Sequence, residues 1–191
     1  WLINFTNPSG MITEAVIKYG KWDRCIGLCN VPTIAMMKEP IALNVDPHEL
    51  IYQFVGLNHF HWHKVYDKDG NELTSKVIDA MLDGKDVGLP ANINNVPFFG
   101  EQIREMNMIP CGYHRYYYRQ QEMLEHSLME YETIGTRGQQ VKETENKLFE
   151  LYKNPNLDHK PEELSKRGGA YYSDAACECI NAIYNNKQTH M

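Results

Sequence analysis

The first 28 residues constrain the fold more than any other part of the sequence. Trp1 to Thr6 is an apolar run that favours a strand, Asn7-Pro8-Ser9-Gly10 is a turn sequence, and Met11 to Tyr19 has the apolar periodicity of a helix. Arg24 to Leu28 is a second short apolar run. A strand, an Asn-Pro turn and a helix in this order are typical of the last βα unit of a dinucleotide-binding sheet. Because a buried strand needs partners in a sheet, we expect that an N-terminal portion of this sheet has been removed.

The remaining sequence predicts an α/β protein in which helices dominate. Val55 to His63 is predicted to be one strand, because aromatic residues are frequent in it. Asp83 to Phe99 is rich in Gly, Asn and Pro and predicts an irregular connection. Pro47 to Phe54 is predicted to be a helix with Asp46 as its N-cap. The other predicted helices cover residues 33–38, 75–82, 102–106, 113–153 with a break at 135–138, and 172–185.

The composition argues against several classes of function. The chain is 42% hydrophobic and 23% charged, as in a globular protein. Its net charge of -6 and pI near 5.7 argue against a nucleic-acid partner, because binding the phosphate backbone needs an excess of Lys and Arg. No run approaches the roughly 20 apolar residues that span a bilayer, and no charged and apolar leader opens the sequence. We therefore expect a cytoplasmic protein with no membrane partner.

The cysteines predict free thiols rather than disulfides or a structural zinc site. Their number is odd, and their spacings lack the paired pattern of a zinc ribbon. Cys177 and Cys179 fall on a predicted helix, where they would point in different directions.

Cys29 and His59 are the strongest candidates for metal ligands. Each follows an apolar run, where side chains emerge from the edge of a sheet into a cleft. A thiolate and an imidazole suit first-row divalent ions, and two protein ligands leave most of the coordination sphere open. The alternative is a core thiol and a hydrogen-bonded histidine, since free cysteine is a common core residue. His61 and His63 would share a face with His59 in a strand, either as further ligands or as surface or supporting residues.

Residues 113–118, Tyr-His-Arg-Tyr-Tyr-Tyr, form the densest aromatic and basic cluster. A tyrosine beside a metal or another cation can have its pKa lowered enough to act as a base. The alternative is that most of these rings pack against a helix or a sheet. Arg137 lies in a Gly-Thr-Arg-Gly break, where its guanidinium could bind a carboxylate or phosphate or could simply face solvent.

Six short motifs occur in the order seen in glycoside hydrolase family 4, and the sequence resembles that family across nearly its whole length. The motifs are Asn7-Pro8-Ser9-Gly10, Cys29-Asn30-Val31-Pro32, Gly56-Leu57-Asn58-His59-Phe60, Tyr113-His114-Arg115-Tyr116-Tyr117, Thr136-Arg137 and Arg167-Gly168-Gly169. Each motif is weak alone, but six in one order are specific. The resemblance implies the α+β C-terminal catalytic domain of a lactate/malate-dehydrogenase-like enzyme, with the N-terminal Rossmann domain mostly absent.

The resemblance also implies roles for single residues. Cys29 and His59 match the two protein ligands of the catalytic divalent metal, usually manganese. Tyr113 matches the catalytic base, with Tyr116 as its nearest competitor for that role. The residues that match substrate-binding positions are Asn7, Asn30 and Arg137. Asn30 occupies the position where α-specific members carry aspartate, so the Cys-Asn pair implies action on 6-phospho-β-glucosides.

The chemistry implied by the resemblance is an exception to the two-carboxylate scheme of glycoside hydrolysis. Bound NAD removes hydride from C3 of the sugar, Tyr113 takes the proton from C2, and the metal acts as a Lewis acid. The leaving group at C1 is then eliminated, water adds, and the hydride returns. The glycine-rich sequence that cradles the pyrophosphate of NAD is absent from these 191 residues. We therefore expect the chain alone to be inactive and to bind NAD weakly, with its NAD-binding residues unknown.

The resemblance divides the chain into two parts. Residues 1–28 would adjoin the dinucleotide-binding domain, and residues 29–191 would bind substrate and metal and form a homodimer or homotetramer. The expected substrate is a phosphorylated disaccharide or an aryl 6-phospho-β-glucoside. Two alternatives stay open. One is another member of the superfamily, namely an α-type glycosidase, an α-galacturonidase-like enzyme or a 2-hydroxy acid dehydrogenase. The other is a non-catalytic module that binds a sugar phosphate or dimerises.

Overall fold

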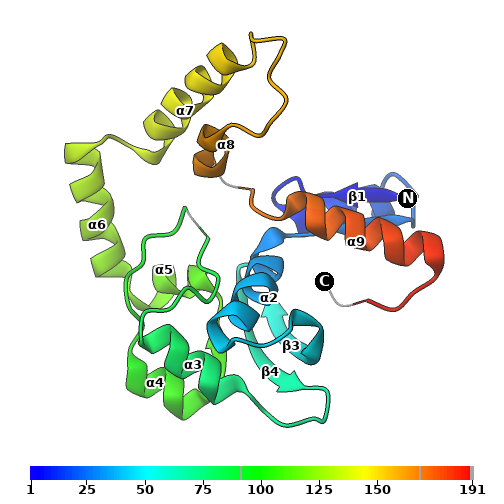
Figure 1. Ribbon diagram of the computed structural model, residues 1–191, viewed down its shortest axis with the longest axis vertical. Helices are drawn as coiled ribbons and strands as arrows, with labels where there is room; N and C mark the ends of the chain where they lie inside the picture. The colour runs from blue at the N-terminus through cyan, green and yellow to red at the C-terminus, as the bar shows by residue number, and fades with distance from the viewer. Residues whose placement is uncertain (91, 168, 190–191) are drawn as a thin grey trace.

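The computed structural model describes residues 1–90, 92–167 and 169–189. Gly168 of the Arg167-Gly168-Gly169 motif and the side chain of Arg167 lie outside the described residues. Figure 1 shows a body of mixed strands and helices from which helices α6 and α7 extend as an arm.

The N-terminal unit has the predicted strand–helix–strand order. Strand β1, Leu2–Asn4, pairs in parallel with β2, Cys25–Gly27, and α1, Ser9–Lys18, connects them. The apolar face of this predicted helix is largely exposed. Ile12 is 36% exposed and Tyr19, directly after α1, is 76% exposed, while Val16 is half-buried. The described part of the chain therefore leaves much of this face uncovered.

Two of the predicted elements between residues 47 and 63 are wrong. Only η1, Pro47–Glu49, is helical, and β3, Leu50–Leu57, follows it at once. Asp46 nevertheless caps η1 as expected, because its side chain accepts a hydrogen bond from the His48 N–H. The predicted strand to His63 is two strands, since β3 pairs with β4, Phe60–Asp67, in an antiparallel hairpin. The β-branched and aromatic residues of β3 overrode the helix-start signal of Asp46 and Pro47 because they pair with β4 over their whole length.

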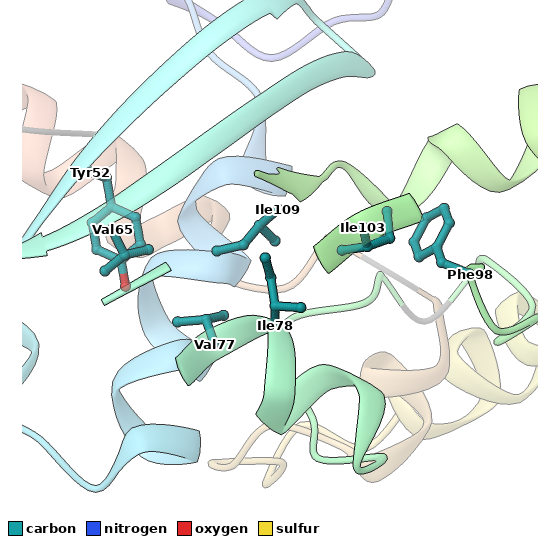
Figure 2. Close-up of a cluster of buried hydrophobic side chains, with 7 residues drawn as sticks. All are labelled: Tyr52, Val65, Val77, Ile78, Phe98, Ile103 and Ile109. Carbon is teal, nitrogen blue, oxygen red and sulfur yellow. The ribbon is translucent and has the colours of Figure 1, made fainter. Parts of the chain in front are cut away.

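The main core lies between this hairpin and helix α3, Thr74–Leu82. Strand β5, Ile109–Pro110, pairs with β4, and α4, Gly100–Met106, packs against α3. Figure 2 shows the seven buried side chains, which are Tyr52, Val65, Val77, Ile78, Phe98, Ile103 and Ile109. Helix α2, Asn30–Leu43, contributes Met36 and Leu43 to its edge. The predicted helices at 75–82 and 102–106 are therefore confirmed. The core packs against the β3–β4 hairpin and holds it in place.

The C-terminal half is helical, as the sequence predicts. After β5 come η2, Gly112–His114, α5, Arg115–Tyr118, α6, Gln120–Thr133, α7, Arg137–Leu151, α8, Glu162–Arg167, and α9, Tyr172–Asn185. Helix α9 lies beside β1 in Figure 1, and the rings of Phe5 and Tyr172 are 5.0 Å apart. All five cysteines are free, with Cys177 exposed and Cys179 buried. Within the described ranges, none of the helices has the length and apolar character needed to cross a membrane.

Candidate metal and substrate site

Cys29 and His59 meet at one end of the fold, 30 positions apart in sequence. The Cys29 Sγ lies 3.6 Å from the His59 Nε2. Cys29 follows β2 and is the N-cap of α2, while His59 lies in the turn between β3 and β4. His59 has a φ of 64°, a left-handed conformation that few residues other than glycine adopt. The strand face that the sequence predicted for His59, His61 and His63 is therefore wrong for His59, which lies in the turn and contacts Cys29.

The separation of these two atoms suits ligands of a single cation. Metal–sulfur and metal–nitrogen bonds of about 2.3 and 2.1 Å at a tetrahedral angle put the two atoms about 3.6 Å apart. In residues 1–90, 92–167 and 169–189, no group of three or more His, Cys, Asp or Glu side chains is placed to hold a metal. A cation held by Cys29 and His59 would therefore have most of its coordination sphere open to other molecules. The role of these residues as metal ligands remains a prediction.

The local electrostatics keep both groups neutral in the absence of a cation. Burial raises the pKa of the Cys29 thiol, while the N–H groups of Val31 and Asn30 at the start of α2 act in the opposite direction. Burial lowers the pKa of His59. A divalent cation between them would favour the thiolate and would use the neutral imidazole directly.

Tyr113 completes this group. Its ring stacks on the His59 ring with 4.2 Å between centroids, and its hydroxyl accepts a hydrogen bond of 3.4 Å from the Asn92 amide. Tyr116 lies with its ring centroid 6.3 Å from that of Tyr113 and is 43% exposed. Burial raises the pKa of Tyr116. Of the two tyrosines considered as base, only Tyr113 has a ring contact with His59 among the described residues.

An open groove of about 660 Å³ runs beside Cys29. One wall is α1, and the other is the end of β3 with the turn that follows it. His61 also borders the groove. A volume of this size is that of a site for a small molecule such as a disaccharide.

Asn7 lies at the same edge of the small sheet as Cys29. Both follow the carboxyl ends of parallel strands, and the Leu28 N–H bonds to the Asn4 carbonyl just beyond those strands. The Asn7 side chain is exposed and, within the described residues, makes no hydrogen bond to Cys29 or His59. The predicted contact of Asn7 with a sugar near the metal stays a prediction.

Asn30 and Arg137 each donate a hydrogen bond to a backbone carbonyl between α7 and α9. The Asn30 amide donates a 2.9 Å hydrogen bond to the Ala170 carbonyl, and the Arg137 Nη2 donates one of 3.0 Å to the Lys166 carbonyl. Four peptide units separate those carbonyls, so they are at most about 14 Å apart. Arg137 is exposed at the start of α7, in the arm, and its described hydrogen bond is to Lys166 rather than to Cys29, His59 or Tyr113. Its role in substrate binding is a prediction.

A buried polar pair, which the sequence did not predict, lies between α2 and β4. Glu39 of α2 and His63 of β4 form a 2.8 Å hydrogen bond with both side chains almost fully buried. His61 and His63 are 7% and 2% exposed, so they are core residues and not surface histidines. The available signal was Glu39 itself, an acidic residue on the apolar face of the helix, with Ala35 four positions before it and Leu43 four positions after it.

Known proteins resemble this chain over nearly its whole length. Residues 54–191 match the model of the family 4 glycosyl hydrolase C-terminal domain, and residues 1–44 match that of the family 4 glycosyl hydrolases. A Bacillus subtilis protein named "Probable 6-phospho-beta-glucosidase" is 49% identical over 98% of this chain and 42% of its own length. The 6-phospho-beta-glucosidase of Escherichia coli is 45% identical, again over 98% of this chain and 42% of the relative. The chain thus spans less than half the length of these relatives.

A solved structure gives the same result at the level of the fold. The 6-phospho-beta glucosidase of Thermotoga maritima, determined with manganese, NAD+ and glucose-6-phosphate, is 32% identical to the chain. It superposes with a TM-score of 0.75 over 93% of this chain and 40% of that one. The mixed helix and sheet fold is therefore shared with part of that chain.

Proposed function

Since this chain belongs to family 4 of the glycosyl hydrolases, we propose that it is the metal- and substrate-binding part of a 6-phospho-β-glucosidase that depends on NAD and a divalent metal. The observation that carries the proposal is the 49% and 45% identity to two proteins named for this activity, each over 98% of the chain. The proposal covers the whole enzyme, in which this chain acts together with a dinucleotide-binding domain.

Cys29 and His59 are the proposed ligands of the metal, with manganese as the expected ion. Their 3.6 Å separation supports this role, and so does the open coordination sphere beside a groove of about 660 Å³. When bound, the ion would supply Lewis acidity at the oxygens of the sugar. Cys29 lines the groove, so an ion held by the two residues would lie beside a sugar bound there.

Tyr113 is the proposed base that takes the proton from C2 of the sugar. Its phenol ring stacks on the His59 ring, so it lies beside the proposed metal ligand, and a nearby cation lowers the pKa of a tyrosine. NAD, when bound, would accept hydride from C3 of the sugar and return it after the bond at C1 has broken. Asn92, which donates to the Tyr113 hydroxyl, would hold the phenol in place.

Asn30 favours the β-type substrate. Its amide donates to the Ala170 carbonyl at 2.9 Å. An aspartate at this position would place a carboxylate oxygen against a carbonyl oxygen, and two acceptors repel each other. The contact of α2 with the segment before α9 therefore suits asparagine and disfavours the aspartate of the α-type pattern.

Asn7 and Arg137 are proposed to bind the rest of the substrate, a phosphorylated disaccharide or an aryl 6-phospho-β-glucoside. Asn7 would meet the sugar at the sheet edge, and the guanidinium of Arg137 would meet the sugar or its phosphate. We also propose a cytoplasmic homodimer or homotetramer. The exposed apolar side chains of α6 and α7, among them Leu124, Leu128 and Phe149, support association. Light scattering on the whole enzyme would measure the oligomer directly.

The test of this function is a substrate panel on the whole enzyme. We expect turnover of an aryl 6-phospho-β-glucoside with NAD and Mn²⁺, and none with the α-anomer or with the glucoside that lacks the phosphate. Loss of turnover on removal of the metal with a chelator, and its return with Mn²⁺, would support the metal role. Equal turnover with and without the phosphate would contradict the proposed substrate class.

A non-catalytic sugar-phosphate-binding module is the alternative from a different class. It predicts that Cys29→Ser leaves the properties of the whole enzyme unchanged, whereas we expect loss of Mn²⁺ binding and of turnover. Cys177→Ser is the matched control, because it makes the same replacement at an exposed position on α9.

A further inference from the structure

The buried Glu39–His63 pair is costly for the stability of the fold. Oε1 of Glu39 and Nε2 of His63 are 2.8 Å apart, and their side chains are 0% and 3% exposed. Glu39 Oε2 and His63 Nδ1 have no hydrogen-bond partner in the described part of the chain, and both residues line a partly open pocket of about 360 Å³. Burying an ionisable pair carries a desolvation cost that well-packed apolar residues would avoid.

Such a pair can fix the relative position of the two elements that it joins. The hydrophobic effect is non-directional, whereas a hydrogen bond is lost once its atoms separate by about an ångström. A shift of α2 by one turn would move its first residues by about 5.4 Å. That distance exceeds the 3.6 Å between Cys29 and His59. A polar contact between α2 and β4 therefore selects one register between the elements that carry the two proposed metal ligands.

The spacing along the two elements matches. Glu39 is ten positions beyond Cys29, which is about 15 Å along α2. His63 is four positions beyond His59, which is about 13 Å along the hairpin strand. Helix α2 begins directly after Cys29, and β4 begins directly after His59. Helix α2 and strand β4 are thus joined at two places, by the Cys29–His59 contact where they begin and by the Glu39–His63 contact further along both elements.

We propose that Glu39 and His63 are positioning residues that hold α2 and β4 in the register that brings Cys29 to His59. The inference rests on the proposed function, because it treats the Cys29–His59 pair as the metal site. It assigns a task to two buried residues that the chemistry itself does not use.

The deciding experiment compares three variants of the whole enzyme by Mn²⁺ titration calorimetry, thermal unfolding and crystallography. In Glu39→Leu/His63→Leu the pair becomes apolar, so the fold keeps its thermal midpoint or gains stability. We expect its Mn²⁺ affinity to fall by about 10- to 100-fold, the usual effect of losing residues that orient metal ligands. Glu39→Gln keeps a hydrogen bond to His63 without the charge, and we expect it to retain most of the affinity.

Thr74→Val is the matched control. Thr74 is also fully buried against β4, where its hydroxyl accepts a 3.1 Å hydrogen bond from the Val65 N–H, but it belongs to α3 and not to α2. We expect it to lower the thermal midpoint and to leave the Mn²⁺ affinity unchanged. An equal loss of affinity in Thr74→Val and in the double variant would mean that any weakening of the core disturbs the site, and it would overturn the proposal.

Two outcomes separate this inference from the proposed function. If the unaltered enzyme binds Mn²⁺ and the double variant binds it equally well, the positioning role is wrong and the function stands. If the unaltered enzyme binds no Mn²⁺, the proposed metal site fails, and the crystal structure of the double variant still decides the positioning role. A Cys29 Sγ to His59 Nε2 separation that stays near 3.6 Å in that structure refutes it, and a clearly longer one supports it.

Discussion

The phenol ring of Tyr113 stacks on the imidazole of His59, with 4.2 Å between ring centroids and 24° between ring planes. His59 comes from the turn of the β3–β4 hairpin, and Tyr113 comes from η2, more than 50 positions later. The stack places a proposed base and a proposed metal ligand in one group without a covalent or charged link between them. Each of the two roles can therefore be removed by itself.

Replacing Tyr113 with Phe separates base chemistry from binding. Tyr113→Phe keeps the ring that stacks on His59 and removes only the hydroxyl, so we expect kcat to fall by about 10²- to 10⁴-fold, the usual contribution of a general base. Mn²⁺ affinity should stay the same. Tyr116→Phe is the matched control and should leave kcat within about twofold, since Tyr116 lacks a ring contact with His59 in the described residues. The opposite ranking in steady-state kinetics would assign the base to Tyr116.

Mn²⁺ affinity should rise with pH. Burial raises the pKa of Cys29 above its ordinary 9.0 and lowers that of His59 below its ordinary 6.5. Between these two values the imidazole is already neutral and the thiol still holds its proton, so binding the ion must release about one proton and affinity should rise roughly tenfold per pH unit. Titration calorimetry in buffers of different ionisation enthalpy measures the released proton. An affinity that does not change with pH would show that Cys29 is not a thiolate ligand.

Adding a methyl group at Gly56 should disturb the His59 turn. Gly56 has a φ of 122°, and a Cβ there would collide with the Phe60 carbonyl and lie 2.8 Å from the His61 Cα. We expect Gly56→Ala to lower Mn²⁺ affinity by about tenfold or more, as loss of ligand orientation does. Gly70→Ala is the control, because Gly70 also has a positive φ, of 83°, but a Cβ there meets nothing within 4 Å. It should lower only the thermal midpoint. Equal Mn²⁺ affinities in the two variants would exclude a special role for the turn.

His114 should be replaceable by Phe with a gain in stability at low pH. The residue is fully buried between the rings of Phe60 and Trp62, and both of its ring nitrogens lack a partner in the described residues. Burial lowers the pKa of His114 to about 4. Below its ordinary pKa of 6.5 the unfolded chain binds a proton that the folded chain does not, so stability falls as the pH drops from 6.5 toward 4.

His114→Phe removes both the unpartnered nitrogens and this proton uptake. We therefore expect a higher thermal midpoint at pH 7 and a smaller decrease of the midpoint at pH 5 than in the unaltered enzyme. Some decrease should remain, because burial also lowers the pKa of His61 to about 4. A lower midpoint at both pH values would show that His114 donates or accepts a hydrogen bond that stabilises the fold.

The sequence by itself predicted the elements whose signals are local. Helix α9 occupies the predicted residues 172–185, and the β1–α1–β2 order follows from two apolar runs and the turn between them. Helix periodicity and turn chemistry depend on residues within a few positions of one another, so they can be read without knowledge of the fold. The motif order likewise singled out Cys29, His59 and Tyr113, which the structure brings together.

Only the tertiary structure decided how these residues meet. The signals around Asp46 and Pro47 indicated a helix, but Leu50–Leu57 pairs with β4, and that pairing turns the chain at His59. The Glu39–His63 contact joins positions 24 apart, and the sequence around either residue does not predict which residue it will contact. Strand pairing and buried polar contacts depend on which surfaces the whole chain brings together, because their free energy comes from burial against distant residues rather than from local conformation.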